Sequence, residues 1–74
     1  MIMKLKELFD LKIIYENVKI IDLDTKTKVE ALRVFNRPTV VEDFKVDLSE
    51  QLSKEVKAIY GSTYKHKLII EVSK

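Results

Sequence analysis

Hydrophobic residues near the N-terminus recur at the spacing of one helix face. Four of them share a side: Ile2, Leu5, Leu8 and Phe9. The charged residues of "MKLKELFD" lie on the other side, as in a surface helix that packs on a core. Continuing this helix would place Lys12 in the middle of its apolar face, and Asn17 favours turns and helix ends. The pattern predicts a short amphipathic helix that ends near Leu11.

Two extended segments follow, with a turn between them. "VKIIDLD" is typical of a strand, and "DTKT" places Asp24 where a turn uses a side chain that bonds its own backbone. "KVEALRVF" alternates between two partly covered faces, which completes a predicted hairpin. Pro38 then interrupts the pattern, because it has no N–H for a ladder and holds Arg37 extended. We interpret "RVFNRPTVV" first as a connection.

The region from residue 39 to residue 48 is ambiguous. It is compatible with a third strand, but Val40, Val41 and Phe44 are also spaced as in a helical turn. The number of strands between Lys26 and Asp47 therefore stays open.

Residues 50–60 also allow two interpretations. Asp47 or Ser49 is a suitable N-cap, and a helical spacing of apolar residues favours one helix as far as Tyr60. The series "EVKAIY", "GSTYKH" and "KLIIEV" favours a short helix and then a terminal hairpin. The last segment, residues 67–72, is the clearest strand: Leu68, Ile70 and Val72 share one face and Ile69 the other.

Length and composition indicate one small soluble domain, residues 1–74. With 74 residues the chain builds only one core, and 46% hydrophobic residues separate it from disordered classes. It has no cysteine, which fits a reducing compartment and leads us to expect a cytoplasmic protein. No apolar run is long enough for a membrane span or a signal peptide.

The charge gives little indication of a polyanionic partner. Fourteen Lys and Arg against 12 Asp and Glu leave a formal net charge of +2, spread along the chain. Nucleic-acid-binding domains normally concentrate basic residues on one face.

The inventory of reactive residues predicts no enzyme, no cofactor and no metal site. The single histidine, His66, lies between two lysines that disfavour its charged form, and no nucleophile with an activating base stands out. Asp22 and Asp24 share a strand face, but two carboxylates alone are too few for Mg²⁺. We interpret them as residues that solvate a strand end and open a turn. The only glycine, Gly61, excludes a phosphate-binding glycine loop.

The succession "LKELFD", "VKIIDLD", "LSKEVKAIY" and "KLIIEV" resembles a group of short proteins from Gram-positive phages and integrated mobile elements. The group has no established biochemical function, so no site residue carries over. The resemblance implies a short helix at about residues 48–53 and a strand at about residues 55–60. The chain departs from the group in "TKTKVEALRVFNRPTVVEDFKVD", which lacks the glycines of its tight turns.

These patterns together predict an α+β fold in a small single domain. We expect an N-terminal helix, an antiparallel sheet of about four to five strands, and a short helix before a C-terminal hairpin.

We expect a protein-interaction module that binds a host or phage protein, as a monomer or weak homodimer. Exposed aromatic and arginine residues concentrate binding energy in interfaces. The alternative is a small single-stranded nucleic-acid-binding protein, in which aromatic rings stack on bases and cations meet phosphates. The candidate surface for both is Arg33, Phe35, Arg37, Tyr60, Tyr64, Lys65 and Lys67.

Overall fold

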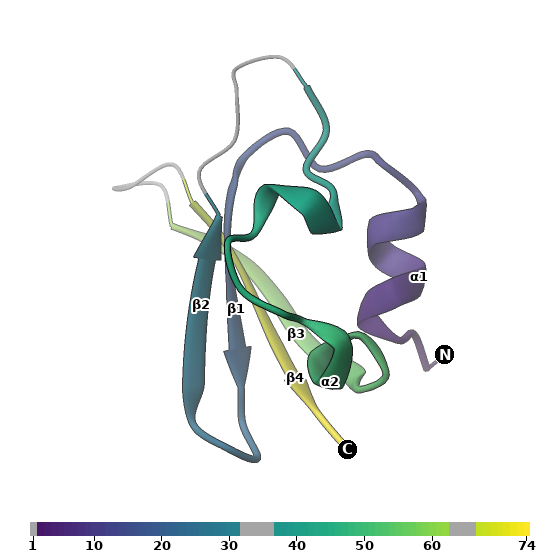
Figure 1. The fold of residues 1–74 in the computed structure, drawn as a ribbon, viewed down its shortest axis with the longest axis vertical. Coiled ribbons are helices and arrows are strands. Elements are labelled where there is room, and N and C mark those ends of the chain that lie inside the picture. Colours follow the sequence, from purple (N-terminus) through teal and green to yellow (C-terminus); the bar gives the residue numbers. More distant parts are fainter. Residues whose placement is uncertain (1, 32–36, 63–66) are drawn as a thin grey trace.

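A four-stranded sheet with helices on one face makes up the described part of the chain. The computed structural model describes residues 2–31, 37–62 and 67–74. In chain order the elements are α1 (Leu5–Asp10), β1 (Asn17–Asp22), β2 (Thr27–Ala31), the 3-10 turn η1 (Val41–Asp43), α2 (Ser49–Leu52), β3 (Glu55–Ser62) and β4 (Lys67–Ser73) (Figure 1). The predicted α+β class is confirmed.

The strands lie in the order β2-β1-β4-β3, and the central pair, β1 and β4, is parallel. The other two pairs are antiparallel. The prediction of a fully antiparallel sheet is therefore wrong for β1 and β4, although α2 does precede an antiparallel pair of strands. Local alternation identifies the apolar face of a strand but not the direction of its neighbour. The two strands with fully buried inward residues occupy the shielded centre, where parallel pairing is usual.

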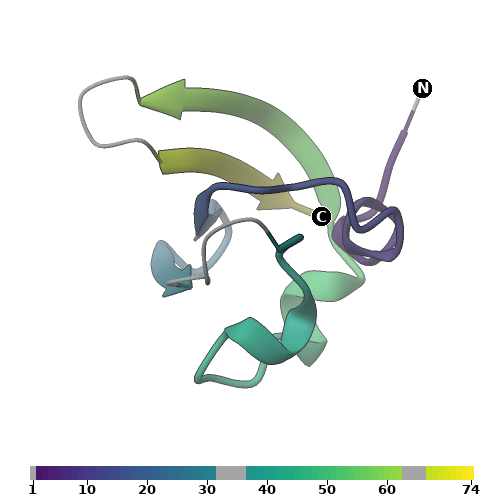
Figure 2. The ribbon, with the colours of Figure 1, turned by 90° about the horizontal axis from the view of Figure 1, so that it is seen from above.

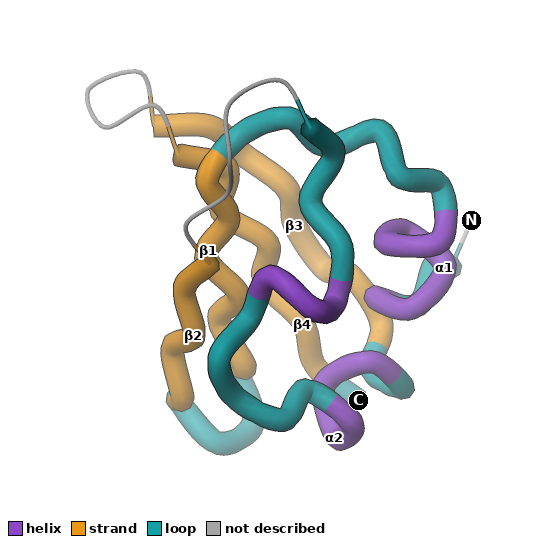
Figure 3. The backbone as a smooth tube through the Cα atoms, turned by 45° about the horizontal axis from the view of Figure 1, so that its top comes forward, coloured by secondary structure: helices purple, strands orange, loops and turns teal. Residues whose placement is uncertain are grey.

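All three helical elements cover the same face of the sheet (Figures 2 and 3). Beneath them, Val18 and Ile20 of β1 and Ile70 and Val72 of β4 are fully buried. The helical layer adds further buried residues: Leu5, Leu8, Phe9, Phe44 and Leu48. The rings of Phe9 and Phe44 meet edge to face with centroids 5.5 Å apart. The core thus lies between one sheet face and the helices. No element of the described residues covers the opposite sheet face, which we call the open face.

The first helix ends where the apolar pattern predicts. α1 stops at Asp10, and Lys12 adopts the left-handed conformation with φ of 53°. This conformation at the end of a helix turns the chain away from the helix axis. The residues after it therefore run back across the sheet towards β1. Within the described ranges, no helix has the length and apolar character needed to cross a membrane.

The alternative of one long helix from residue 48 to Tyr60 is wrong. α2 is a single turn, and β3 begins at Glu55, in agreement with the predicted strand at residues 55–60. Backbone pairing explains the change, because the Val56 N–H donates to the Met3 carbonyl at 2.7 Å while the other side of β3 pairs with β4. These hydrogen bonds stabilise the extended conformation more than the helical spacing of apolar residues stabilises a helix.

Residues 39–48 do not form the third strand that was one of the two predicted alternatives. Val41–Asp43 forms η1, and Phe44 makes only an isolated antiparallel bridge to Ala31. β2 covers the first part of the predicted strand at residues 28–35, and residues 32–36 lie outside the described residues.

Candidate functional site

The predicted site residues divide into two groups. Arg33, Phe35, Tyr64 and Lys65 lie outside the described residues. Arg37 is in the segment that leads into η1, whereas Tyr60 and Lys67 are on the open face of the sheet. The structure therefore does not bring the described three together on one surface.

Arg37 pairs with a buried carboxylate. Its guanidinium contacts Asp43, whose side chain is 1% exposed. The other carboxylate oxygen of Asp43 accepts the Val40 N–H at 3.0 Å, at the start of η1. The arginine thus neutralises a charge that the turn buries, and this contact gives it a structural role.

Tyr60 and Lys67 also make contacts within the sheet. The Tyr60 hydroxyl donates to Glu71 at 3.3 Å, and burial together with this negative charge raises the pKa of Tyr60. Lys67 donates to Glu30 at 3.0 Å, and Lys19 lies 3.8 Å from the same carboxylate. The open face therefore carries mixed rather than concentrated charge.

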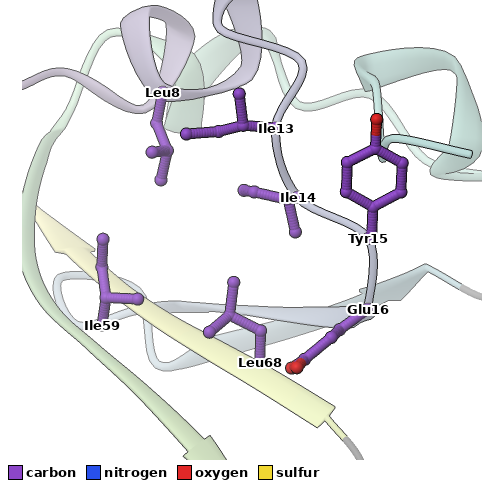
Figure 4. A pocket seen from close by; sticks show the side chains of 7 residues that line it. All are labelled: Leu8, Ile13, Ile14, Tyr15, Glu16, Ile59 and Leu68. Carbon is purple, nitrogen blue, oxygen red and sulfur yellow. The ribbon is translucent and has the colours of Figure 1, made fainter.

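An apolar groove lies on the helical side of the sheet. Seven residues line it: Leu8, Ile13, Ile14, Tyr15, Glu16, Ile59 and Leu68. Its volume is about 380 Å³. In Figure 4, Leu8 and Ile13 lie across the opening from Ile59 and Leu68. We call this set of residues the groove.

Three of the groove side chains are large, apolar and solvent-accessible. Ile13 is 63% exposed, Tyr15 51% and Ile59 48%. They come from the connection after α1 and from β3, so they are far apart in the sequence. Water-exposed apolar surface collected in one depression is typical of a binding site rather than of a random surface.

Backbone contacts position the connection that forms one wall of the groove. The left-handed Lys12 directs the chain back from α1. The Thr39 hydroxyl donates to the Glu16 carbonyl at 3.1 Å, and Thr39 itself is 1% exposed. Its N–H donates to the Ile14 carbonyl. The wall is therefore tied to the segment before η1.

Glu16 is the one charged residue of the groove. In Figure 4 its carboxylate lies at the Leu68 end. No lysine or arginine among the described residues pairs with it. The groove consequently offers an apolar surface with one negative charge at its border.

A second, buried cluster joins β1 to α2. The Lys54 ammonium lies 2.6 Å from Asp22 and 3.2 Å from Asp24, and Gln51 donates its amide to Asp22 at 3.0 Å. Asp22 is 1% exposed and Lys54 3%. The expectation that Asp22 and Asp24 solvate a strand end is therefore wrong for Asp22. The ammonium occupies the place between the two carboxylates.

Asp22, and not Asp24, also holds the turn after β1. Its second carboxylate oxygen, which does not bond to Lys54 or Gln51, accepts hydrogen bonds from the N–H groups of Asp24 at 3.0 Å and Thr25 at 3.3 Å. Desolvation raises the pKa of Asp22, but bonds from Lys54, from Gln51 and from these N–H groups outweigh it and lower the pKa to about 2. The bond to Asp22 raises the pKa of Lys54.

We expect stability to decline in acid as Asp22 takes up a proton. Because the folded pKa is about 2 and the ordinary value 3.8, the contribution is present above pH 3.8 and is lost as the pH falls towards 2. The raised pKa of Lys54 leaves its contribution intact until the pH exceeds 10.5. Urea unfolding at a series of pH values, with ¹³C NMR titration of the Asp22 carboxyl, measures this. A midpoint near 3.8 for Asp22 would contradict it.

The cluster faces neither the groove nor a metal site. Among the described residues, no three His, Asp or Glu side chains gather as metal ligands do. Three carboxylates, those of Asp22, Asp24 and Glu50, lie within 3.8 Å of the Lys54 ammonium. We assign the cluster a structural role, which connects the β1 end to α2.

Sequence reasoning did not identify the groove or the cluster. Asp22 follows Val18 and Ile20 at a spacing of two, so alternation was a signal for its inward position that the charge of the side chain outweighed in our interpretation. The apolar "LKIIY" directly after a helix end was a signal for the groove wall. Its partners on β3 and β4 required the tertiary structure.

Comparison of the chain with protein-family models, with curated proteins and with solved structures gave no match.

Proposed function

We propose that the chain is a non-enzymatic protein-interaction module that binds an apolar part of another protein in the groove. The observation that carries this proposal is the gathering of Ile13, Tyr15 and Ile59, each about half exposed or more, around one depression. Burying such side chains against a partner gives the favourable free energy that drives association. Tyrosine is also one of the residues that most often anchor interface centres.

The resemblance to phage and mobile-element proteins supports a host or phage protein as the partner. Small proteins of such elements often act by occupying a surface of a host enzyme or defence complex. A stable domain with a preformed apolar groove suits this mode of action, including stoichiometric inhibition. Such inhibition needs binding residues but no chemistry of its own.

The nucleic-acid alternative receives less support from the charges. Tyr60 is 44% exposed on the open sheet face and is suited to stacking. The lysines of the same sheet face, Lys19 and Lys67, both pair with Glu30. A surface whose cations are matched by carboxylates attracts phosphates only weakly.

Capture from a lysate of a Gram-positive bacterium tests the proposed function. We expect the wild type to retain a protein that the Ile59→Asp variant loses, because the new carboxylate places a charge in an apolar interface. Quantitative mass spectrometry after nuclease treatment is the measurement, and the nuclease removes capture through nucleic acid.

Leu23→Asp is the matched control. Leu23 is 44% exposed at the end of β1, close to the exposure of Ile59, but it does not line the groove. Both variants add one carboxylate to a half-exposed aliphatic position, so they change the net charge equally. Identical captured sets for all three proteins would contradict the proposed function.

A further inference from the structure

The start of β3 already pairs with residues 3–5 through an isolated bridge. The Leu5 N–H donates to the Lys54 carbonyl at 3.0 Å, and the Val56 N–H donates to the Met3 carbonyl at 2.7 Å. These two bonds form an antiparallel bridge between Lys4 and Glu55. The outer edge of β3 is therefore able to pair with an extended chain beside α1.

The orientation of the backbone N–H and C=O groups of β4 shows which backbone groups of β3 do not bond to β4. The Val72 carbonyl accepts the Leu23 N–H at 2.9 Å, so the polar groups of Val72 face β1. The N–H and C=O of one strand residue point to the same side, and successive residues alternate. The polar groups of Ile69 and Glu71 therefore face β3.

Beyond Val56 the outer edge of β3 has no described partner. Tyr60 pairs with Ile69 and Ala58 with Glu71, so the polar groups of Ala58 and Tyr60 point towards β4. Those of Ile59 and Gly61 point away from the sheet, where no described backbone group meets them. An extended peptide would find two N–H and two C=O groups there.

The features that usually prevent an edge strand from pairing with other chains occur only in the first half of β3. The register shifts between Val56 and Ala58, which marks a bulge, and Lys57 lies at it. Bulges and lysines are common devices against pairing with other chains. Residues 58–62, with the sequence "AIYGS", contain no charge. This second half is the part that lies beside the groove.

The groove lies on the side to which an added strand would direct alternate side chains. Ile59 pairs with the buried Ile70 and lies on the same face of the sheet. It lines the groove together with Leu8 of α1. A strand next to Ile59 therefore places one side chain in two towards the space between β3 and α1. Aliphatic side chains fit this lining.

Charge at the border of the groove defines the partner further. Glu16 is its only charged residue and has no ion-pair partner among the described residues. A cation on the bound segment would complement this carboxylate, whereas an acidic residue would be repelled.

We propose that the second half of β3 binds an extended segment of the partner protein as an additional antiparallel strand. The segment has aliphatic residues two positions apart, directed into the groove, and a lysine or arginine that reaches Glu16. It follows the line of residues 3–5 along the same edge. This inference rests on the proposed function and specifies the chemistry of the partner.

The test uses random ten-residue peptides displayed on phage and selected on the immobilised full chain. We expect the selected peptides to share alternate aliphatic residues and a basic residue. Fluorescence anisotropy then gives their dissociation constants for the wild type and for variants whose folding is checked by amide NMR spectra.

Three variants separate the features of the site. Ile59→Asp puts a charge into the groove and should weaken binding about tenfold or more. Gly61→Pro should have a similar effect, because it removes an outward N–H while leaving the β4 pairing intact. Glu16→Gln should weaken the binding of basic peptides by about two- to fivefold and leave the binding of other peptides unchanged. The Leu23→Asp control should stay within about twofold of the wild type.

Each contrary result overturns the inference in a distinct way. Peptides whose dissociation constants change with neither Ile59→Asp nor Gly61→Pro bind elsewhere. The inference is then wrong, and the lysate experiment decides the proposed function separately. Sensitivity to Ile59→Asp without sensitivity to Gly61→Pro excludes strand addition but keeps the groove. Failure to select any peptide overturns the inference too. If sedimentation then shows a dimer that Ile59→Asp dissociates, a second copy is the occupant.

Discussion

Replacing Asp22 with asparagine is expected to lower the free energy of unfolding by about 3 to 5 kcal/mol. The variant keeps the shape of the side chain but removes the charge that faces Lys54 at 2.6 Å. Both carboxylate oxygens of Asp22 accept hydrogen bonds, one from Lys54 and Gln51 and the other from two backbone N–H groups, so the NH₂ group of asparagine would face donors in either orientation. A buried ammonium that loses its nearest and most buried carboxylate, and donors that oppose one another, are each costly.

A loss of this size would approach the whole stability of a 74-residue domain, which is roughly 4 to 11 kcal/mol. Urea or guanidinium unfolding followed by circular dichroism measures it. Asp24→Asn is the matched control, because the side chain of Asp24 is 35% exposed and lies 3.2 Å from the same ammonium. We expect the control to cost about 1 kcal/mol or less. Equal losses in the two variants would show that burial of Asp22 does not set its contribution.

Shortening Ile70 to alanine is expected to destabilise the protein by about 2 to 5 kcal/mol. Ile70 is fully buried and lies between Ile20 of β1 and Ile59 of β3 in the sheet register. Its removal leaves a cavity at the centre of the core, which the surrounding strands fill only in part. Thermal or chemical unfolding measures the change.

Ile69→Ala is the control for Ile70→Ala, since the two residues are neighbours with the same side chain. Ile69 belongs to the open face and is only half-buried, so its truncation should cost clearly less. A cost for Ile69 equal to that for Ile70 would contradict the assignment of the inner face. Leu68 is less suited to this test, because it is only partly buried and lines the groove.

The two variants address different links between β1 and the rest of the molecule. Ile70 connects the centre of the sheet to the apolar core, whereas Asp22 connects the end of β1 to Gln51 of α2 and to Lys54 just after it, 29 and 32 residues later in the chain. Neither residue lies in the groove. Loss of binding in groove variants is therefore separable from loss of folding.

The sequence by itself determined the elements that depend on local periodicity. The N-terminal helix, which stops at Asp10, and the inward face of β4 with Ile70 and Val72 follow from spacings of 3.6 and 2. The short helix before β3 does not, because the apolar spacing there favours a longer helix. The strand spacing also relates Asp22 to Ile20, but the charge of its carboxylate favours a solvated strand end, and the burial of Asp22 is a feature of the tertiary structure. Such patterns record which side of an element is apolar, and this information is contained within a few residues.

The tertiary structure alone decided which elements are neighbours. The parallel pairing of β1 with β4 joins segments that are far apart in sequence, and no local pattern specifies strand direction. The partner that makes Asp22 tolerable inside is Lys54, because a buried charge requires a counter-charge brought by another element. The groove likewise exists only because Lys12 turns the chain back and brings Ile13 opposite Ile59. Each of these features is a contact between distant residues, which the periodicity of a single element does not encode.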